Sequence, residues 1–550
     1  MLSLNTLSFS NLKGDMLGGL TAAIVSLPLA LTFGVASGAG AEAGLYGAII
    51  IGLFASIFGG TPTLISEPTG PMTVVMTAVV TSLIAANPEN GMAMAFTVVM
   101  LAGLFQIIFG LLKLGKYITL MPYSVVSGFM SGIGVILILL QLAPALGQTS
   151  PTGGVLGTLF ALPELLANIV SVELVLFALT LLILFFTPAN IKKNIPPQLI
   201  ALVMISVVSV FAFSTMPIQR IGEIDVSLPN MVWPSFTHDQ VRVMLLDALV
   251  LGMLGCIDSM LTSVIADNLT RTEHKSNKEL IGQGMGNIMS GLFGGLPGAG
   301  ATMGTVVNIQ AGGRTALSGI IRVIVLIVAV FGAASLIELI PLAVLAGIAV
   351  KVGVDILDWS FIKRAHRVSR HSTVIMYAVL LLTVFVDLIV AVGIGVFIAN
   401  VITIEKLSAS QSKNIKAMSD VDDRNPLDPE QRKLLNQAQG KVLFFYLSGA
   451  MIFGVSKAIA RERKSIQNHE VVVIDLSDVT MLDDTITLSL ENVIDEAIDL
   501  GKTVYVVVNT AKGKEKLQNL GRHSQLRDEN FTQSRTAALK MALLKVQARF

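Results

Sequence analysis

The sequence GLYGAIIIGLFASIFGGTP, at Gly44–Pro62, returns 235 residues later as ELIGQGMGNIMSGLFGGLP, at Glu279–Pro297. Gly47 matches Gly282, and the motif Gly-Gly-x-Pro closes both stretches. A short apolar segment that begins among Gly and Pro residues follows each copy of this motif. Glycines that only allow close helix packing are the alternative interpretation, but packing does not explain why the breaks recur in register. We therefore predict an internal repeat with one interrupted helix in each copy.

The composition places this repeat in a membrane. Hydrophobic residues make up 53% of the 550 residues. Residues 1–350 contain 27 Asp, Glu, Lys and Arg residues, about 8%, whereas the last 200 contain 48, or 24%, which is the level of a soluble domain. A disordered chain, a secreted disulfide scaffold and a basic nucleic-acid binder are excluded, because the chain is apolar, has the single cysteine Cys256 and has a net charge of +1.

Apolar stretches recur along the chain until about residue 405, and most are long enough to span a bilayer. With the N-terminus in the cytoplasm, twelve Lys and Arg residues fall in cytoplasmic loops and only Arg220 and Arg242 fall outside, as the positive-inside rule requires. An even number of crossings returns the C-terminal region to the cytoplasm. We expect fourteen crossings or partial crossings, near 16–37, 42–59, 69–86, 93–112, 120–142, 171–187, 197–213, 244–266, 278–294, 301–311, 316–337, 340–356, 372–386 and 388–405.

The two copies, about 12–213 and 244–405, each hold seven of these segments. Because seven is odd, the copies run through the bilayer in opposite senses, which is the architecture of secondary transporters. The short segments, 69–86 and 301–311, would each start a helix at membrane depth. Their free N–H groups and positive dipole ends would then face a central cavity and form an anion site without a charged side chain.

Three residues at the starts of the short segments are candidate anion ligands. Thr69 lies near the start of the first and offers a hydroxyl to an oxyanion. Ala301 and Thr302 open the second, after Gly298 and Gly300, so that their N–H groups can point into the cavity. Simple N-capping is the alternative role for both threonines, and it is compatible with anion binding.

Asp258 is the charged residue that we expect at membrane depth, because it lies in the middle of an apolar stretch. Thr262 follows it by four residues, on the same helix face. The Asp258 carboxylate, the Thr262 hydroxyl and unwound carbonyls of Gly300 and Thr302 are hard oxygen ligands suited to a bound Na⁺. The same carboxylate could carry a proton instead, either for coupling or as a structural aspartate between helices.

The remaining charged and metal-binding residues of the apolar region suggest no further chemistry. We expect Arg322 and Lys351 to extend toward the cytoplasmic surface. All six histidines lie outside the expected spans, so that a haem or zinc site built from histidine is excluded there. We therefore expect a transporter, not a membrane redox enzyme or a metalloprotease.

The chain after residue 407 has a different character. A polar linker, 408–439, precedes alternating strand and helix patterns over 440–533 that indicate a small α/β domain. The tail 534–550 forms a basic helical pattern to which we assign no role. At the start of one helix, Asp484 or Thr485 could cap it, or Thr485 could be a phosphorylation site.

These features together resemble the SulP/SLC26 family of anion transporters, which carry a C-terminal STAS domain. The resemblance covers nearly the whole chain. The motifs that carry it are Pro28-Leu-Ala-Leu-Thr-Phe-Gly, Glu67-Pro-Thr-Gly-Pro, Gly300-Ala-Thr, Gly312-Gly-Arg-Thr, Lys351-Val-Gly and the STAS-like VVVIDLSDVTMLDDT that ends at Thr485. Within the family the chain is most similar to the Na⁺-dependent bicarbonate transporters.

The resemblance implies a core domain, which carries the two short helices, and a gate domain that moves against it across a transmembrane domain 1–407. It implies substrate near Thr69, Ala301 and Thr302, and a homodimer with STAS contacts. Many family members have Arg where this chain has Gly304, and a cation at Asp258 would replace that charge.

We thus expect Na⁺-coupled bicarbonate uptake across the inner membrane, with both termini in the cytoplasm. The alternatives are an H⁺-coupled sulfate or dicarboxylate transporter, an uncoupled anion channel, and a membrane-tethered STAS signalling module.

Overall fold

The computed structural model describes residues 5, 9–115, 122–151, 153–192, 195–222, 229–365, 367–386, 388–419, 427–509, 511–520 and 526–548. The start of the expected span 120–142, part of the linker 408–439, part of the domain 440–533 and the tail residues 549–550 lie outside the described residues. The chain forms two compact units, Met1–Phe397 and Ile398–Phe550.

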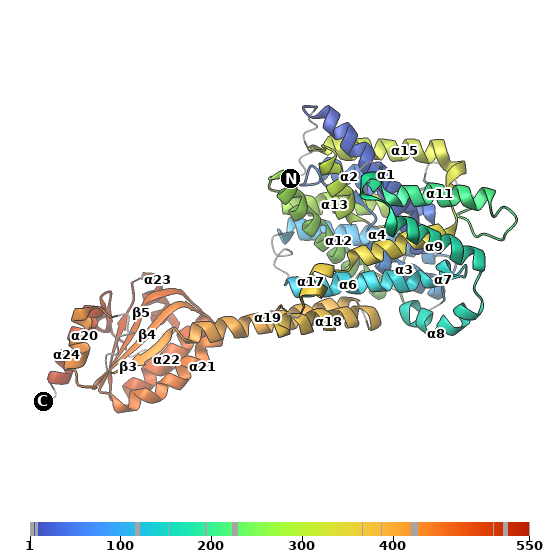
Figure 1. The fold of residues 1–550 in the computed structure, drawn as a ribbon. Helices are drawn as coiled ribbons and strands as arrows, with labels where there is room; N and C mark the ends of the chain where they lie inside the picture. The colour runs from blue at the N-terminus through green and yellow to red at the C-terminus, as the bar shows by residue number, and fades with distance from the viewer. Residues whose placement is uncertain are drawn as a thin grey trace. The chain divides into compact units, whose positions relative to one another are not determined.

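The first unit is helical, and each of the fourteen apolar segments contains a helix (Figure 1). The first copy contains α1 (Leu12–Ala36), α2 (Ala41–Phe58), α3 (Gly70–Ala86), α4 (Gly91–Leu111), α6 (Tyr123–Leu140), α7 (Leu142–Ala145), α8 (Gly154–Ala167), α9 (Ser171–Phe186), α10 (Ala189–Lys192) and α11 (Pro197–Phe211). The second contains α12 (Val241–Thr270), α13 (Ser276–Leu292), α14 (Thr302–Gln310), α15 (Ala316–Ile337), α16 (Leu342–Ile356), α17 (Trp359–Arg364), α18 (Arg370–Phe385) and α19 (Leu388–Ser412).

The lengths of these helices bear on how many of them cross a membrane. Among the described residues, seven helices are long and apolar enough to do so, or eight if α8 and α9, which are bent by 116°, form one span. Three shorter apolar helices are α3, α11 and α18. A helical membrane protein is therefore confirmed, while the number of fourteen crossings stays a prediction.

The packing of α2 against α13 shows that the two copies of the repeat are inverted. Gly47, near the start of α2, lies against Leu296, beyond the end of α13, where a Cβ would be 2.8 Å from the Leu296 carbonyl oxygen. Its repeat partner Gly282, near the start of α13, lies against Gly59, at the end of α2, where a Cβ would be 2.5 Å from the Gly59 nitrogen. These equivalent helices thus run antiparallel, as an odd number of segments per copy predicts.

The second unit is a five-stranded sheet between two layers of helices. The strand order is β3-β4-β5-β6-β7, with β3 antiparallel to β4 and the other pairs parallel. Alternate side chains of β4 and β5 enter two separate cores, as the two-residue period of a strand requires. The strands are β3 (Ile415–Met418), β4 (Val442–Met451), β5 (Val471–Leu482), β6 (Thr503–Val507) and β7 (Phe531–Thr532).

Helices from the expected linker and tail complete this unit. The first core packs against α21 (Ser456–Glu462), α22 (Asp484–Asp499) and α23 (Ala511–Leu520). The second packs against α20 (Pro429–Gln437) and α24 (Arg535–Gln547). The segment 408–439 therefore contributes β3 and α20, and the tail contributes α24. The polar composition of these two segments did not predict that they pack on the sheet, because only one side of α20 and of α24 is buried.

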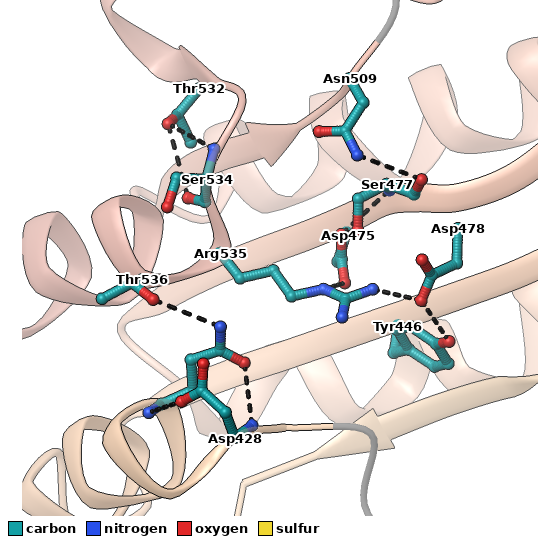
Figure 2. A network of polar contacts seen from close by, with 11 residues as sticks. Asp428, Tyr446, Asp475, Ser477, Asp478, Asn509, Thr532, Ser534, Arg535 and Thr536 are labelled. Atoms are coloured by element: carbon teal, nitrogen blue, oxygen red, sulfur yellow. Dashed lines mark hydrogen bonds and ion pairs between the residues drawn. The ribbon is translucent and has the colours of Figure 1, made fainter.

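Arg535 fastens α24 to the sheet (Figure 2). Its Nε atom donates to Asp475 at 2.6 Å, and its second nitrogen contacts Asp478. The Asp475 side chain is fully buried, and the Tyr446 hydroxyl donates to Asp478 at 2.7 Å. Burial acts to raise the pKa of Asp478, but the hydrogen bonds from Tyr446 and Arg535 outweigh it and hold the pKa below its ordinary value. This pairing therefore stabilises the unit at neutral pH and is lost as the pH falls through that lowered pKa.

Replacing Arg535 should release α24. In Arg535→Met, Asp475 stays buried without a cation, which costs about 3 kcal/mol, so we expect faster hydrogen exchange in the α24 peptides of the full-length protein. Lys540→Met is the matched control, because its ion pair with Glu430 joins side chains that are 55% and 60% exposed and is worth about 1 kcal/mol or less. Equal exchange in Arg535→Met and the wild type would contradict this role.

Candidate functional site

Two very short strands bring the starts of the interrupted helices together. β1 (Ser66–Glu67) pairs with β2 (Ala299–Gly300) in antiparallel fashion, with Ser66 opposite Gly300. α3 begins three residues after β1 ends, and α14 begins two residues after β2 ends. Because the strands are antiparallel, their helices leave in opposite directions. The pairing therefore brings the segments that precede the two helix N-termini side by side.

Side chains of α12 and α13 hold β2 in place. Asn287 donates to the Gly298 carbonyl at 2.9 Å and accepts from the Gly298 N–H at 2.8 Å, as a neighbouring strand would. Ser259 accepts from the Gly300 N–H at 3.0 Å. Gly298 must lack a side chain, because a Cβ would lie 2.5 Å from the Glu67 carbonyl oxygen. The Gly298 backbone and the Gly300 N–H thus have partners within the protein.

The N-terminus of α3 has unoccupied donors. Thr69 is the N-cap residue, but its side chain makes no capping hydrogen bond, and its buried hydroxyl has no hydrogen-bond partner among the described residues. The N–H groups of Gly70 and Met72 also have none there. N-capping is therefore not the role of the Thr69 hydroxyl in this structure.

The N-terminus of α14 corrects one expectation. The N–H of Ala301, the N-cap residue, donates to the Ile65 carbonyl at 2.8 Å and so does not face the cavity. The sequence could not show this, because the acceptor, Ile65, directly precedes β1 and lies more than 200 residues earlier in the chain. The N–H groups of Thr302, Met303 and Gly304 make no hydrogen bond within the described residues and are the donors that this helix presents.

Asp258 lies next to Thr69. It is in the middle of α12 and only 7% exposed, and its Oδ2 atom has no hydrogen-bond partner among the described residues. The Thr69 hydroxyl faces the carboxyl group without closing a hydrogen bond of standard geometry. Asp258 therefore has one oxygen without a partner and one hydroxyl beside its carboxyl group.

Thr262 connects the other predicted cation ligands. Its hydroxyl donates to the Gly300 carbonyl at 2.8 Å and lies 2.9 Å from the Thr302 hydroxyl. Three of the four residues are thus in direct contact, and Asp258 lies one turn away on the same helix. Thr302 is the first residue of α14 and not unwound, so its hydroxyl, in place of its carbonyl, is the oxygen that it offers.

An ion pair that the sequence analysis missed lies beside this site. Arg322, on α15, is fully buried and donates to Glu67, on β1, at 2.6 Å. The expectation that Arg322 extends to the surface is wrong. Its position near one end of an apolar segment had suggested the surface, although the side chain faces the interior. Lys351, in contrast, has a 17% exposed side chain and pairs with Asp355 at 2.5 Å.

Asp258 is also not the only buried carboxylate of the helical unit. Glu279 accepts from the N–H groups of Gly60 and Thr61, both at 2.7 Å. Asp15 accepts from the N–H groups of Arg314 and Thr315 at the start of α15. These carboxylates have backbone donors, so they join helices, whereas the Oδ2 atom of Asp258 has none.

Thr485 lies at the start of α22 in the second unit. The cap is Asp483, whose side chain accepts from the Asp484 N–H at 2.8 Å, so neither Asp484 nor Thr485 caps this helix. The Thr485 side chain is exposed. Lys516 neutralises Asp484 at 2.7 Å, which lowers the negative charge around Thr485.

Two proteins are similar in sequence to nearly the whole of this chain. The bicarbonate transporter BicA of Synechocystis sp. is 62% identical over 540 residues, which cover 98% of this chain and 96% of that protein. BicA of Picosynechococcus sp. is 59% identical over 546 residues, with the same coverage. Both names agree with the likeness to bicarbonate transporters seen in the motifs.

Solved structures agree with this likeness. The transmembrane domain of a cyanobacterial BicA superposes with a TM-score of 0.68 at 66% identity and covers 71% of this chain and 99% of that one. SLC26A9 superposes with a TM-score of 0.81 at 18% identity, covering 99% and 92%, which shows the fold alone. Residues 433–537 match the STAS domain, and residues 12–379 match the Sulfate permease family. The chain therefore belongs to the sulfate permease (SulP/SLC26) family of anion transporters, with a C-terminal STAS domain.

Proposed function

We propose that this chain takes up bicarbonate by symport with Na⁺. One observation carries the proposal: β1 and β2 bring together two helix N-termini whose first N–H groups have no partner among the described residues, and Thr69, at the start of one of them, lies beside the buried carboxyl group of Asp258. The helix N-termini suit an oxyanion, and the buried carboxylate suits a cation. The names of the two similar relatives support bicarbonate as the anion.

The anion would bind between α3 and α14. The N–H groups of Gly70, Met72, Thr302, Met303 and Gly304 are its backbone donors, and the Thr69 hydroxyl is its side-chain donor. Each helix N-terminus adds about half a positive charge. Backbone donors of this kind recognise a small planar oxyanion without a fixed cation, which accords with Gly304 in this chain.

The cation follows from electrostatics. Asp258 faces Thr69, so an anion bound there would be repelled by a carboxylate, at a cost of about 4 kcal/mol for charges about 4 Å apart. A Na⁺ held by Asp258, Thr262, the Gly300 carbonyl and the Thr302 hydroxyl removes this repulsion. Anion and cation then bind together more tightly than either alone, which is the requirement for symport.

We also propose a location, an oligomeric state and a regulatory site for the protein. The excess of Lys and Arg in alternate loops supports the inner membrane with both termini in the cytoplasm. We also propose a homodimer with contacts between STAS domains, and regulation through phosphorylation of Thr485, whose exposed side chain lies beside Lys516–Asp484.

Transport by the purified protein tests the coupling. In liposomes, an inward Na⁺ gradient should drive uptake of labelled bicarbonate, and sulfate should be a poor substrate. Uptake that is unchanged without Na⁺ would overturn the symport. Uptake driven by a pH gradient would favour the H⁺-coupled alternative, and passive flux of both anions would indicate a channel.

Asp258→Asn should reduce Na⁺-driven uptake by about 100-fold or more, because a neutral amide cannot balance the cation. The yield of folded protein and its oligomeric state should not change. Asp247→Asn, on the same helix but near its start, is the control and should transport normally. Wild-type Na⁺ dependence in Asp258→Asn would place the cation elsewhere.

Thr485→Ala and Thr485→Glu test the regulatory proposal. We expect mass spectrometry to detect phosphate on Thr485 in cells, Thr485→Ala to abolish it, and the two variants to differ in uptake rate. An absence of phosphate together with equal rates would leave Thr485 without a regulatory role.

A further inference from the structure

Arg322 makes more contacts with protein groups than an ion pair needs. Its guanidinium donates to the Ser26 hydroxyl of α1 at 2.8 Å, to the Ala48 carbonyl of α2 at 3.1 Å and to the Ser66 carbonyl of β1 at 3.2 Å, as well as to Glu67. The side chains of Arg322 and Glu67 are 1% and 3% exposed. One residue of the second copy thus joins three elements of the first.

These contacts lead directly to the proposed site. Ser66 is paired with Gly300, and the Gly300 carbonyl accepts from Thr262. Glu67 precedes Thr69 by two residues. A shift of β1 would therefore move the N-terminus of α3, and through β2 it would move that of α14.

The cost of burying the two charges argues against a role in stability alone. A buried ion pair contributes little net stability, and apolar residues of similar size often replace one without loss. What an apolar pair cannot do is satisfy the Ser66 and Ala48 carbonyls or hold them in one geometry. Arg is suited to this task, because its planar fork donates in several fixed directions.

We infer that Arg322, held by Glu67, is a positioning residue that fixes β1 and thereby sets the relative placement of the two helix N-termini. It does not touch the anion or the cation. Its loss therefore lowers the affinity for both, because the donors of α3 and α14 and the oxygens of Thr262 and Thr302 no longer converge.

Arg322→Lys is the decisive variant. The lysine keeps a positive charge beside Glu67, so the protein should fold. It cannot reach Ser26, Ala48 and Ser66 at once, because it lacks the planar fork of arginine. We expect the half-saturating concentrations of both bicarbonate and Na⁺ to rise about tenfold, with a smaller change in maximal rate. Glu67→Gln combined with Arg322→Met removes both charges and should fold with the same loss of affinity.

Hydrogen exchange of the full-length protein provides a readout that needs no transport. In Arg322→Lys, peptides that cover residues 64–68 and 298–304 should exchange about tenfold faster than in the wild type, and α6 should not change. Glu173→Gln is the control, because Glu173 is also only 1% exposed but lies on α9 and accepts from the Gln219 N–H at 2.6 Å. It should alter neither affinity nor exchange at β1 and β2.

Only the affinity measurement rests on the proposed function; the hydrogen-exchange measurement does not. If the wild type transports another anion or needs no Na⁺, the proposed function fails, and the exchange arm and the affinity for that other anion still test the inference. Wild-type exchange at β1 and β2 in Arg322→Lys, with wild-type affinities, would overturn it. Faster exchange without a loss of affinity would overturn it as well, because β1 would then not control the site.

Discussion

Backbone groups that leave a helix at membrane depth must find partners within the protein, because lipid offers none. In this chain the pairing of β1 with β2 meets that requirement for both interrupted helices at once. Ser259 and Thr262 bond Gly300 of β2, and Asn287 bonds Gly298, which precedes this strand. The first N–H groups of α3 and α14 take no part in this pairing and have no hydrogen-bond partner among the described residues. In the function that we propose, the arrangement that gives β1 and β2 their partners also leaves donors for an anion.

The electrostatics of the site follow from the same arrangement. The two helix ends carry a partial positive charge, and neither their first N–H groups nor the Oδ2 atom of Asp258 has a hydrogen-bond partner among the described residues. In the function that we propose, an anion and a cation that bind together would complete the balance, whereas either one alone would leave a charge uncompensated in a medium of low polarity. Glu67 and Arg322 contribute no net charge. Their effect on the site is geometric, since they determine where β1 lies.

Sequence patterns predicted the repeat, the helix in each apolar segment, and the α/β character of the second unit, because hydrophobic periodicity and Gly/Pro breaks are local signals. They also pointed to Thr69, because it lies at the start of an interrupted helix, and to Asp258 and Thr262, because a carboxylate at membrane depth is uncommon and Thr262 follows it by one helical turn. They misplaced the Ala301 N–H and Arg322. Each of those depends on a partner more than 200 residues away in the sequence.

The sequence by itself predicted the inverted repeat, from two similar copies with an odd number of apolar segments each, and it determined that a carboxylate lies within an apolar helix. Only the tertiary structure decided which backbone donors remain free, that Thr69 does not cap its helix, and that Arg322 faces inward to Glu67. The physical reason is that a hydrogen bond depends on the positions of both partners. The sequence shows the donor in one segment and the acceptor in another, but only the folded chain brings the two within hydrogen-bond distance.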